Sequence, residues 1–126
     1  MSTHLYLAFN ALMYAVFAAW CTMAPRQTAE FVGLRTASSG GESEYLAVYG
    51  GLQAGLALFF GLASVSESQQ RSALWLSVLL YGGISAFRTI AVVRLGFGQL
   101  GNARFFYCAE IVLFLIAALL LARRPA

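Results

Sequence analysis

Four long apolar segments dominate the sequence and leave few folds open to it. They cover residues 5–24, 45–65, 73–93 and 105–122. A helix needs roughly 20 residues to cross a hydrocarbon core of about 30 Å, so each segment is long enough to span a membrane. Lipid offers no hydrogen-bond partners, and the continuous apolarity lacks the alternation typical of a transmembrane barrel. The sequence therefore predicts an all-α integral membrane protein, a single four-helix bundle formed by residues 1–126.

The overall composition agrees with a membrane protein. Apolar residues make up 60% of the chain and charged residues only 10%, which is far from the balance of a soluble globular domain. The formal charge is +3, but the arginines are scattered near the ends of the apolar segments and form no basic stripe. We therefore expect no nucleic-acid partner, and we expect the lipid bilayer itself to be the main partner.

The first apolar segment lies where a secretory signal peptide would lie. It is too long for the apolar region of a signal peptide, however, and no Lys/Arg-rich stretch precedes it. Pro25 directly follows its end and disfavours cleavage there. We expect this segment to be retained as the first span.

The connection between the first two spans contains signals for a short helix. Pro25 stands where a helix can begin and Gly33 where one can end. Phe31 and its apolar neighbours can face the bilayer while polar residues face water, which favours a short interfacial helix after the first span. Residues 36–44 are predicted to form a flexible polar link, with Ser43 as the N-cap of the second span.

The second span carries small residues at a regular spacing. Ala47, Gly51 and Gly55 are four apart and would give the helix one smooth face. Such faces allow close approach of another helix backbone. The other helix can belong to the same bundle or to another copy of the chain. The sequence predicts packing inside the bundle and leaves a homo-oligomer open.

Two charged residues interrupt the last two spans. Arg88 lies five residues before the end of the third span, or roughly 8 Å from it at 1.5 Å per residue. Glu110 lies five residues after the start of the fourth span. Antiparallel neighbours would bring the two side chains level with each other. Since a paired arginine and carboxylate cost far less in lipid than either alone, we predict an ion pair.

Other polar and aromatic side chains are expected to surround this pair. The hypothesis is a small intramembrane pocket whose ligand-binding groups are Arg88, Glu110, Tyr49, Gln53 and Tyr107. The predicted lining of the apolar part is Trp20, Phe59, Phe87 and Phe114.

Two interpretations of the pair remain open. In the first, Arg88 and Glu110 only fix the register of the last two helices, because paired intramembrane charges need not transport or catalyse anything. In the second, Arg88 holds the anionic head of a lipid-like or other small ligand. We therefore expect a small binding or accessory membrane protein. The alternatives are a proton-coupled transporter or channel, in which Glu110 would titrate, and a purely structural or assembly subunit.

Catalytic and cofactor-binding patterns are missing from the sequence. The single histidine, His4, is at the N-terminal end, so no histidine-based metal or haem site can be assembled within the spans. Cys21 and Cys108 do not form a Cys-x-x-Cys motif, and we expect buried free thiols, with a disulfide between them left open if their face is periplasmic. We expect no metal and no cofactor, and we place an enzyme behind the other interpretations.

The chain resembles a bacterial family of unknown function, composed of small inner-membrane proteins with four helices that are distantly similar to DoxX-like proteins. The resemblance is carried by residues 24–25, 31–34 and 44–55, by Arg88 and by Glu110. It implies the four-helix fold and a location in the bacterial inner membrane. It implies no activity, because the family has none established.

The arginines are divided almost evenly between the two faces of the predicted bundle. Arg71 in the expected 66–72 loop, together with Arg123 and Arg124, lies on the face of the termini. The opposite face carries Arg26, Arg35, Arg94 and Arg104. Positive residues close to span ends favour the cytoplasm. Because Arg123 and Arg124 directly follow the last span, we expect both termini in the cytoplasm.

Overall fold

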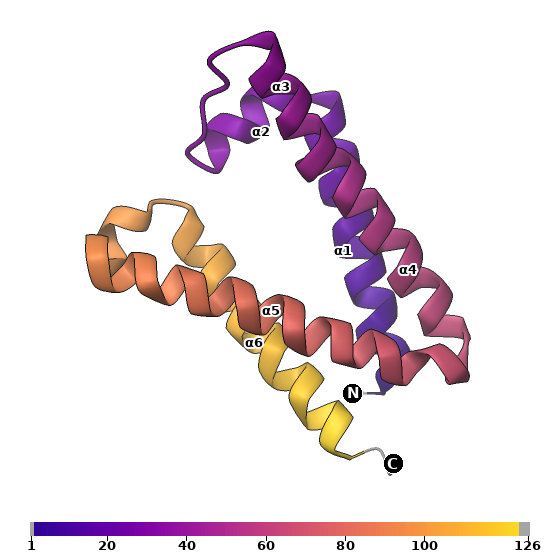
Figure 1. Ribbon diagram of the computed structural model, residues 1–126. Coiled ribbons are helices and arrows are strands. Elements are labelled where there is room, and N and C mark those ends of the chain that lie inside the picture. The colour runs from indigo at the N-terminus through magenta and orange to yellow at the C-terminus, as the bar shows by residue number, and fades with distance from the viewer. Residues whose placement is uncertain (1, 124–126) are drawn as a thin grey trace. The chain divides into compact units, whose positions relative to one another are not determined.

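The computed structural model describes residues 2–123, and these residues are almost entirely helical. The elements are α1 (Thr3–Met23), α2 (Pro25–Phe31), α3 (Ser39–Tyr45), η1 (Leu46–Leu52), α4 (Gln53–Val65), α5 (Glu67–Leu95), η2 (Phe97–Leu100) and α6 (Ala103–Ala122) (Figure 1). No strand occurs among them. The chain divides into two compact units, one ending at Gln69 and the other beginning at Gln70, and each is described by itself.

Four helices are long and apolar enough to cross a membrane. They are Thr3–Met23, Ser39–Val65, Glu67–Leu95 and Ala103–Ala122. The predicted all-α class with four long apolar helices is thus confirmed, and length and composition place the chain among multi-pass membrane proteins. The single-domain organisation stays a prediction.

The second and third long helices begin earlier than the sequence predicts. Ser38, not Ser43, is the N-cap of α3, because its Oγ accepts a hydrogen bond from the Gly41 backbone N–H at 3.2 Å. The predicted link over residues 36–44 is therefore partly helical. The expected 66–72 loop is also wrong: only Ser66 separates α4 from α5.

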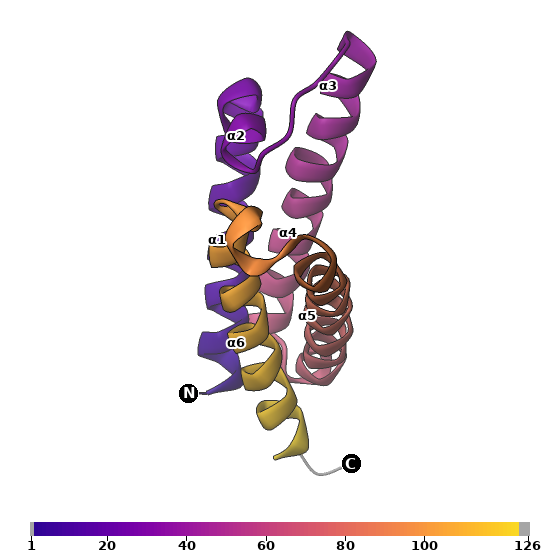
Figure 2. The same cartoon turned by 90° about the vertical axis from the view of Figure 1, so that its left-hand side faces the viewer.

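In the first unit, α1 lies alongside the continuous helix formed by α3, η1 and α4 (Figures 1 and 2). The rings of Tyr14 and Phe60 stack with centroids 5.8 Å apart. Toward the start of α1, His4 Nδ1 lies 2.6 Å from the carbonyl oxygen of Ser64. Because the partner in α4 moves back from Ser64 to Phe60 as the contact in α1 moves forward from His4 to Tyr14, the two helices are antiparallel neighbours.

A glycine permits the closest approach between these helices. A Cβ added at Gly50 would lie only 2.9 Å from Thr22 Oγ1, so the position next to α1 has no room for a side chain. Around Gly51 and Gly55, by contrast, no atom of the described chain lies within 4 Å of such a Cβ, and Ala47 is also exposed. The prediction that this face packs inside the bundle is therefore wrong for the first unit. The helix meets α1 through Gly50 instead, so Ala47, Gly51 and Gly55 are left on its open face.

The short helix after the first span is confirmed, and glycine ends it as predicted. Gly33 has a φ of 80°, a left-handed conformation that favours glycine. Its N–H donates to Glu30 O at 3.0 Å, and the N–H of Leu34 donates to Ala29 O at 2.8 Å. These two bonds form a Schellman motif, which satisfies carbonyls at the end of α2 and turns the chain back along it.

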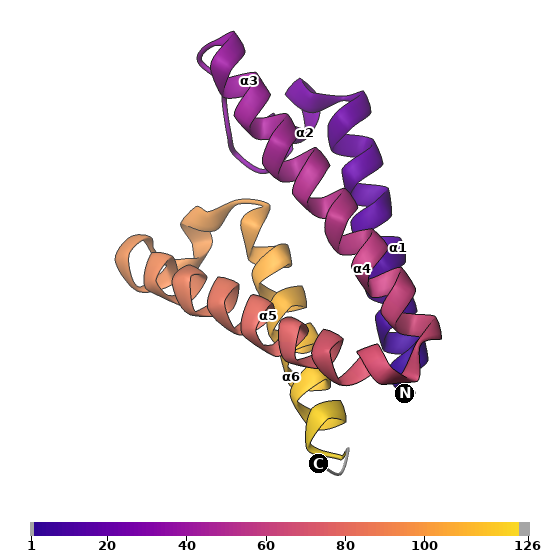
Figure 3. The ribbon, with the colours of Figure 1, turned by 45° about the vertical axis from the view of Figure 1, so that its right-hand side comes forward.

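The second unit contains α5 from Gln70 onward, η2 and α6, and the chain reverses through η2 (Figure 3). Gly96 and Gly101 flank η2 with φ values of 89° and 54°, so both ends of the turn use backbone conformations that favour glycine. Further along, a Cβ added at Gly82 would lie 3.1 Å from Phe114 Cε2. The missing side chain at Gly82 therefore makes room for an aromatic ring of α6.

Candidate functional site

Arg88 of α5 and Glu110 of α6 form the ion pair that the sequence predicts. Arg88 Nε donates to Glu110 Oε2 at 2.6 Å, and Arg88 Nη2 donates to Oε1 at 3.2 Å. Such two-point contacts between a guanidinium and a carboxylate fix orientation as well as distance. The arginine side chain is 32% exposed and the glutamate 14%. The pair is thus largely enclosed, with the open side on the arginine.

Two further hydroxyl groups lie on the same two helices, one residue after Arg88 and three residues before Glu110. Thr89 Oγ1 donates to the carbonyl oxygen of Ser85 at 2.8 Å, and it lies 2.9 Å from the hydroxyl of Tyr107. Because the threonine proton is used on Ser85, the tyrosine must be the donor in the second bond. Tyr107 therefore forms a second hydrogen-bonded link from α6 to α5, one helical turn before Glu110.

The cluster retains hydrogen-bonding groups without partners. A guanidinium has five N–H donors, and Glu110 engages one on Nε and one on Nη2 of Arg88. The remaining N–H groups of Arg88 contact no acceptor among residues 2–123. Ser85 Oγ, one helical turn before Arg88, is buried and likewise has no partner in the described chain. An oxyanion could be held by the free arginine donors, whereas the buried Ser85 oxygen is closed to a ligand.

The second unit contains two of the predicted apolar lining residues. Phe114 is packed inside the unit, and Phe87 is exposed. Phe114 lies against Gly82, inside the unit. Phe87 is 77% exposed, although it is adjacent in sequence to Arg88. An exposed ring beside a membrane-embedded arginine offers apolar surface to a lipid chain.

The remaining predicted site residues belong to the first unit. Tyr49 stacks on Tyr45 with centroids 4.5 Å apart, and Trp20 packs on Phe31 at 5.5 Å. Phe59 meets the edge of its neighbour Phe60. The Gln53 backbone N–H donates to the carbonyl oxygen of Gly50, but its side chain makes no hydrogen bond to any residue that the structure describes. A pocket that unites these four predicted residues with Arg88 stays a prediction.

A polar contact not predicted from the sequence joins three helices of the first unit. The Tyr45 hydroxyl donates to Thr28 Oγ1 at 2.9 Å and lies 3.5 Å from Cys21 Sγ. Thr28 in turn donates to the carbonyl oxygen of Ala24 at 2.8 Å. Both cysteines are free, and Cys21 is buried as predicted whereas Cys108 is exposed. The predicted burial of Cys108 is wrong because its side chain lies on an open face of α6.

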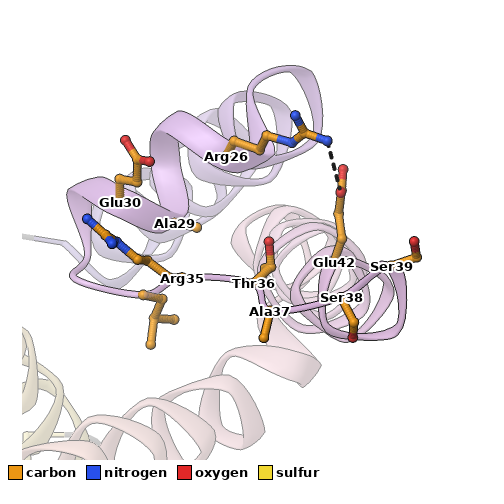
Figure 4. Close-up of a pocket in the computed structure, with 10 residues that line it drawn as sticks. Arg26, Ala29, Glu30, Arg35, Thr36, Ala37, Ser38, Ser39 and Glu42 are labelled. Atoms are coloured by element: carbon orange, nitrogen blue, oxygen red, sulfur yellow. Dashed lines mark ion pairs between the residues drawn. The ribbon is translucent and has the colours of Figure 1, made fainter.

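The connection after α1 also forms a pocket that sequence reasoning missed. It has a volume of about 590 Å³ and is built by α2, the following loop and the start of α3 (Figure 4). Its lining residues are Arg26, Ala29, Glu30, Leu34, Arg35, Thr36, Ala37, Ser38, Ser39 and Glu42. Across it, Arg26 Nη2 lies 3.8 Å from Glu42 Oε2. The alternation of basic and acidic residues after Pro25 was the available sequence signal.

Comparison of the chain with protein-family models, curated proteins and solved structures finds no match. The resemblance to DoxX-like proteins therefore stays a prediction. Within the described residues, no group of three or more His, Cys, Asp or Glu side chains is arranged to hold a metal ion. The fold and the Arg88–Glu110 cluster define the class: a small multi-pass helical protein with an ion pair inside its apolar segments.

Proposed function

We propose that this protein binds an anionic, lipid-like ligand at the polar cluster of α5 and α6. The observation that carries the proposal is the incomplete engagement of Arg88: Glu110 holds one edge of the guanidinium, and the other N–H groups have no partner among the described residues. Arginine binds phosphate and carboxylate oxygens through such pairs of N–H donors. An uncommitted donor within an apolar segment is costly, so an anion there would be stabilised.

Each residue of the cluster has a separate role in this proposal. Glu110 orients the guanidinium, and the remaining N–H groups of Arg88 hold the anion. Tyr107 fixes Thr89 beside them. The ring of Phe87, which is 77% exposed, packs against the apolar chain of the ligand.

The cellular setting is part of the same proposal. We place the protein in the bacterial inner membrane with both termini in the cytoplasm, in line with the resemblance to DoxX-like proteins. Met1 and Arg124, which bear on this orientation, lie outside the described residues. A homo-oligomer through Ala47, Gly51 and Gly55 fits the open surface at these positions.

Native mass spectrometry of the full chain in a non-ionic detergent tests the binding. The protein is titrated with phosphatidylglycerol, which is anionic, and with phosphatidylcholine, which carries no net charge. The double variant R88M/E110L removes both charges while keeping apolar volume. We expect the wild-type protein to bind phosphatidylglycerol at least tenfold more tightly than phosphatidylcholine, and the variant to lose that preference. An unchanged preference in the folded variant would overturn the proposal.

The purely structural role is the second candidate, and the two-point hydrogen bonding of Arg88 to Glu110 favours it. In that case the pair only links α5 to α6. The titration separates the two candidates, since a purely structural pair predicts that the wild-type protein and R88M/E110L bind both lipids alike.

A further inference from the structure

The pocket formed by residues 26–42 is a second place where ligand chemistry is assembled, in the first unit and independent of Arg88. It is built locally. The Schellman motif at Gly33 turns the chain so that Leu34 and Arg35 return beside Ala29, and all three line the pocket. Ser38 then caps α3 and brings Glu42 to the opposite side (Figure 4).

Residues of both charges line this pocket. Arg26 and Arg35 are positive, Glu30 and Glu42 are negative, and the four formal charges cancel. Arg26 and Glu42 approach within 3.8 Å across the pocket, a long contact for an ion pair whose arginine is 84% exposed. Glu30 and Arg35 make no ion pair or hydrogen bond with any other side chain of the described chain. One carboxylate and one guanidinium are therefore free to bind.

This charge pattern selects for a ligand that also carries both signs. A simple anion would meet two carboxylates, and a simple cation would meet two guanidiniums, so each would be repelled by half of the lining. A zwitterion can place its anionic group near the arginines and its cationic group near the glutamates. We infer that the pocket binds a phosphoethanolamine group, with the phosphate on Arg35 and the primary ammonium on Glu30.

The chemistry of the lining favours phosphate and a primary amine. A guanidinium matches phosphate oxygens with paired N–H donors. Thr36, whose hydroxyl points toward the pocket in Figure 4, adds a hydroxyl donor. A primary ammonium can donate hydrogen bonds to the Glu30 carboxylate, whereas the trimethylammonium of phosphocholine has no N–H to donate.

The pocket lies in the connection between two candidate spans. The first span ends at Met23 and the second begins at Ser39. Trp20 packs on Phe31 at 5.5 Å, and aromatic residues of this kind are enriched where membrane meets water. Phe31 and Leu34 are each more than 40% exposed and available to acyl chains. Phosphoethanolamine can therefore reach the pocket as a lipid headgroup or as a soluble headgroup.

The test compares two double variants that remove one positive and one negative charge each. E30Q/R35Q neutralises the free charges of the pocket, and E67Q/R104Q neutralises exposed charges outside it. The full chain in a non-ionic detergent is titrated by native mass spectrometry with phosphatidylethanolamine, phosphatidylcholine and phosphatidylglycerol. Glycerophosphoethanolamine, which has the headgroup without acyl chains, is titrated in a separate arm.

We expect E30Q/R35Q to weaken phosphatidylethanolamine binding at least tenfold, and E67Q/R104Q to leave it within twofold of the wild-type value. Phosphatidylcholine binding should change by less than twofold in both variants. If E30Q/R35Q loses glycerophosphoethanolamine binding to a comparable extent, the pocket is a site for a soluble headgroup. If it loses only phosphatidylethanolamine binding, the pocket is a site for the lipid. Both outcomes support the proposed chemistry.

Two results would overturn the inference. One is equal phosphatidylethanolamine binding by E30Q/R35Q and E67Q/R104Q. The other is a loss of phosphatidylglycerol binding as large as that of phosphatidylethanolamine, which would show a site for anions. Because Glu30 and Arg35 are exposed, their substitution should not disturb the fold. Circular dichroism verifies the helix content of each variant.

Discussion

Arg88 holds both carboxylate oxygens of Glu110, through Nε at 2.6 Å and Nη2 at 3.2 Å. The two residues come from α5 and α6, which η2 connects. The reversal of the chain at η2 therefore places the two opposite charges next to each other. Within apolar segments this pairing removes most of the cost of either charge. It also leaves one edge of the guanidinium available, because a carboxylate has only two oxygens to offer.

Breaking the pair from one side should destabilise the protein more than removing it altogether. R88M leaves Glu110 unpaired, and E110L leaves Arg88 unpaired, and each should cost about 3 kcal/mol of unfolding free energy. The double variant R88M/E110L should recover most of that loss, because no uncompensated charge remains. Thermal unfolding in detergent, monitored by circular dichroism, provides the measurement. Additive losses in the double variant would contradict the pairing.

Gly50 and Gly51 should differ sharply although they are adjacent in η1. A side chain at Gly50 collides with Thr22 Oγ1, which is itself held by a hydrogen bond to Ala18 O at 2.7 Å. Overpacking of this kind costs about 1–3 kcal/mol, so G50L should lower the unfolding temperature. G51L is the matched control and should not lower it, because no described atom is close. Equal effects of the two variants would contradict the packing of α1 on η1.

The hydroxyl of Tyr45 should couple energetically to Thr28. Y45F removes the 2.9 Å hydrogen bond while keeping the ring stacked on Tyr49, and should cost about 1 kcal/mol. T28V should cost a similar amount or more, since it also removes the bond to Ala24. A double-mutant cycle of unfolding free energies should show a coupling of about 1 kcal/mol. Strict additivity would mean that the two hydroxyls do not interact.

A side chain at Gly33 should destabilise the turn at the end of α2. Its φ of 80° costs roughly 1–2 kcal/mol for a residue with a Cβ, so G33A should loosen the end of α2. Hydrogen exchange of the Gly33 and Leu34 region measures this, because their amides make the Schellman bonds. G98A, at a glycine without a positive φ, is the control. Unchanged exchange in G33A would contradict the observed turn.

The sequence predicts the long helices well because a membrane-spanning segment is recognised by its length and its continuous apolarity. It also predicts the Arg88–Glu110 pair, since equal distances from a short connection place residues of antiparallel helices level. Both inferences depend on local, periodic properties. The short helix α2 was predictable because its start and end signals, Pro25 and Gly33, are also local.

The features that sequence reasoning missed depend on contacts that a helical period does not encode. The start of α3 moves to Ser39 because the Ser38 side chain satisfies the Gly41 amide. Gly51 is open because its neighbour Gly50 is the glycine that meets Thr22 of α1, a choice of face that small-residue spacing does not reveal. The pocket after α1 needs the reversal at Gly33 together with the Ser38 cap, so its charges are brought together only by the folded chain.

The most direct test of the central claim is a solid-state NMR measurement of carbon–phosphorus dipolar coupling in phospholipid bilayers, with protein labelled at the guanidinium carbons of arginine. If Arg88 holds a lipid phosphate, the wild-type protein shows phosphorus dephasing of a guanidinium signal that is absent from the spectrum of R88M/E110L. An identical dephasing pattern in the two proteins would contradict the claim, because it would mean that no phosphate lies beside Arg88.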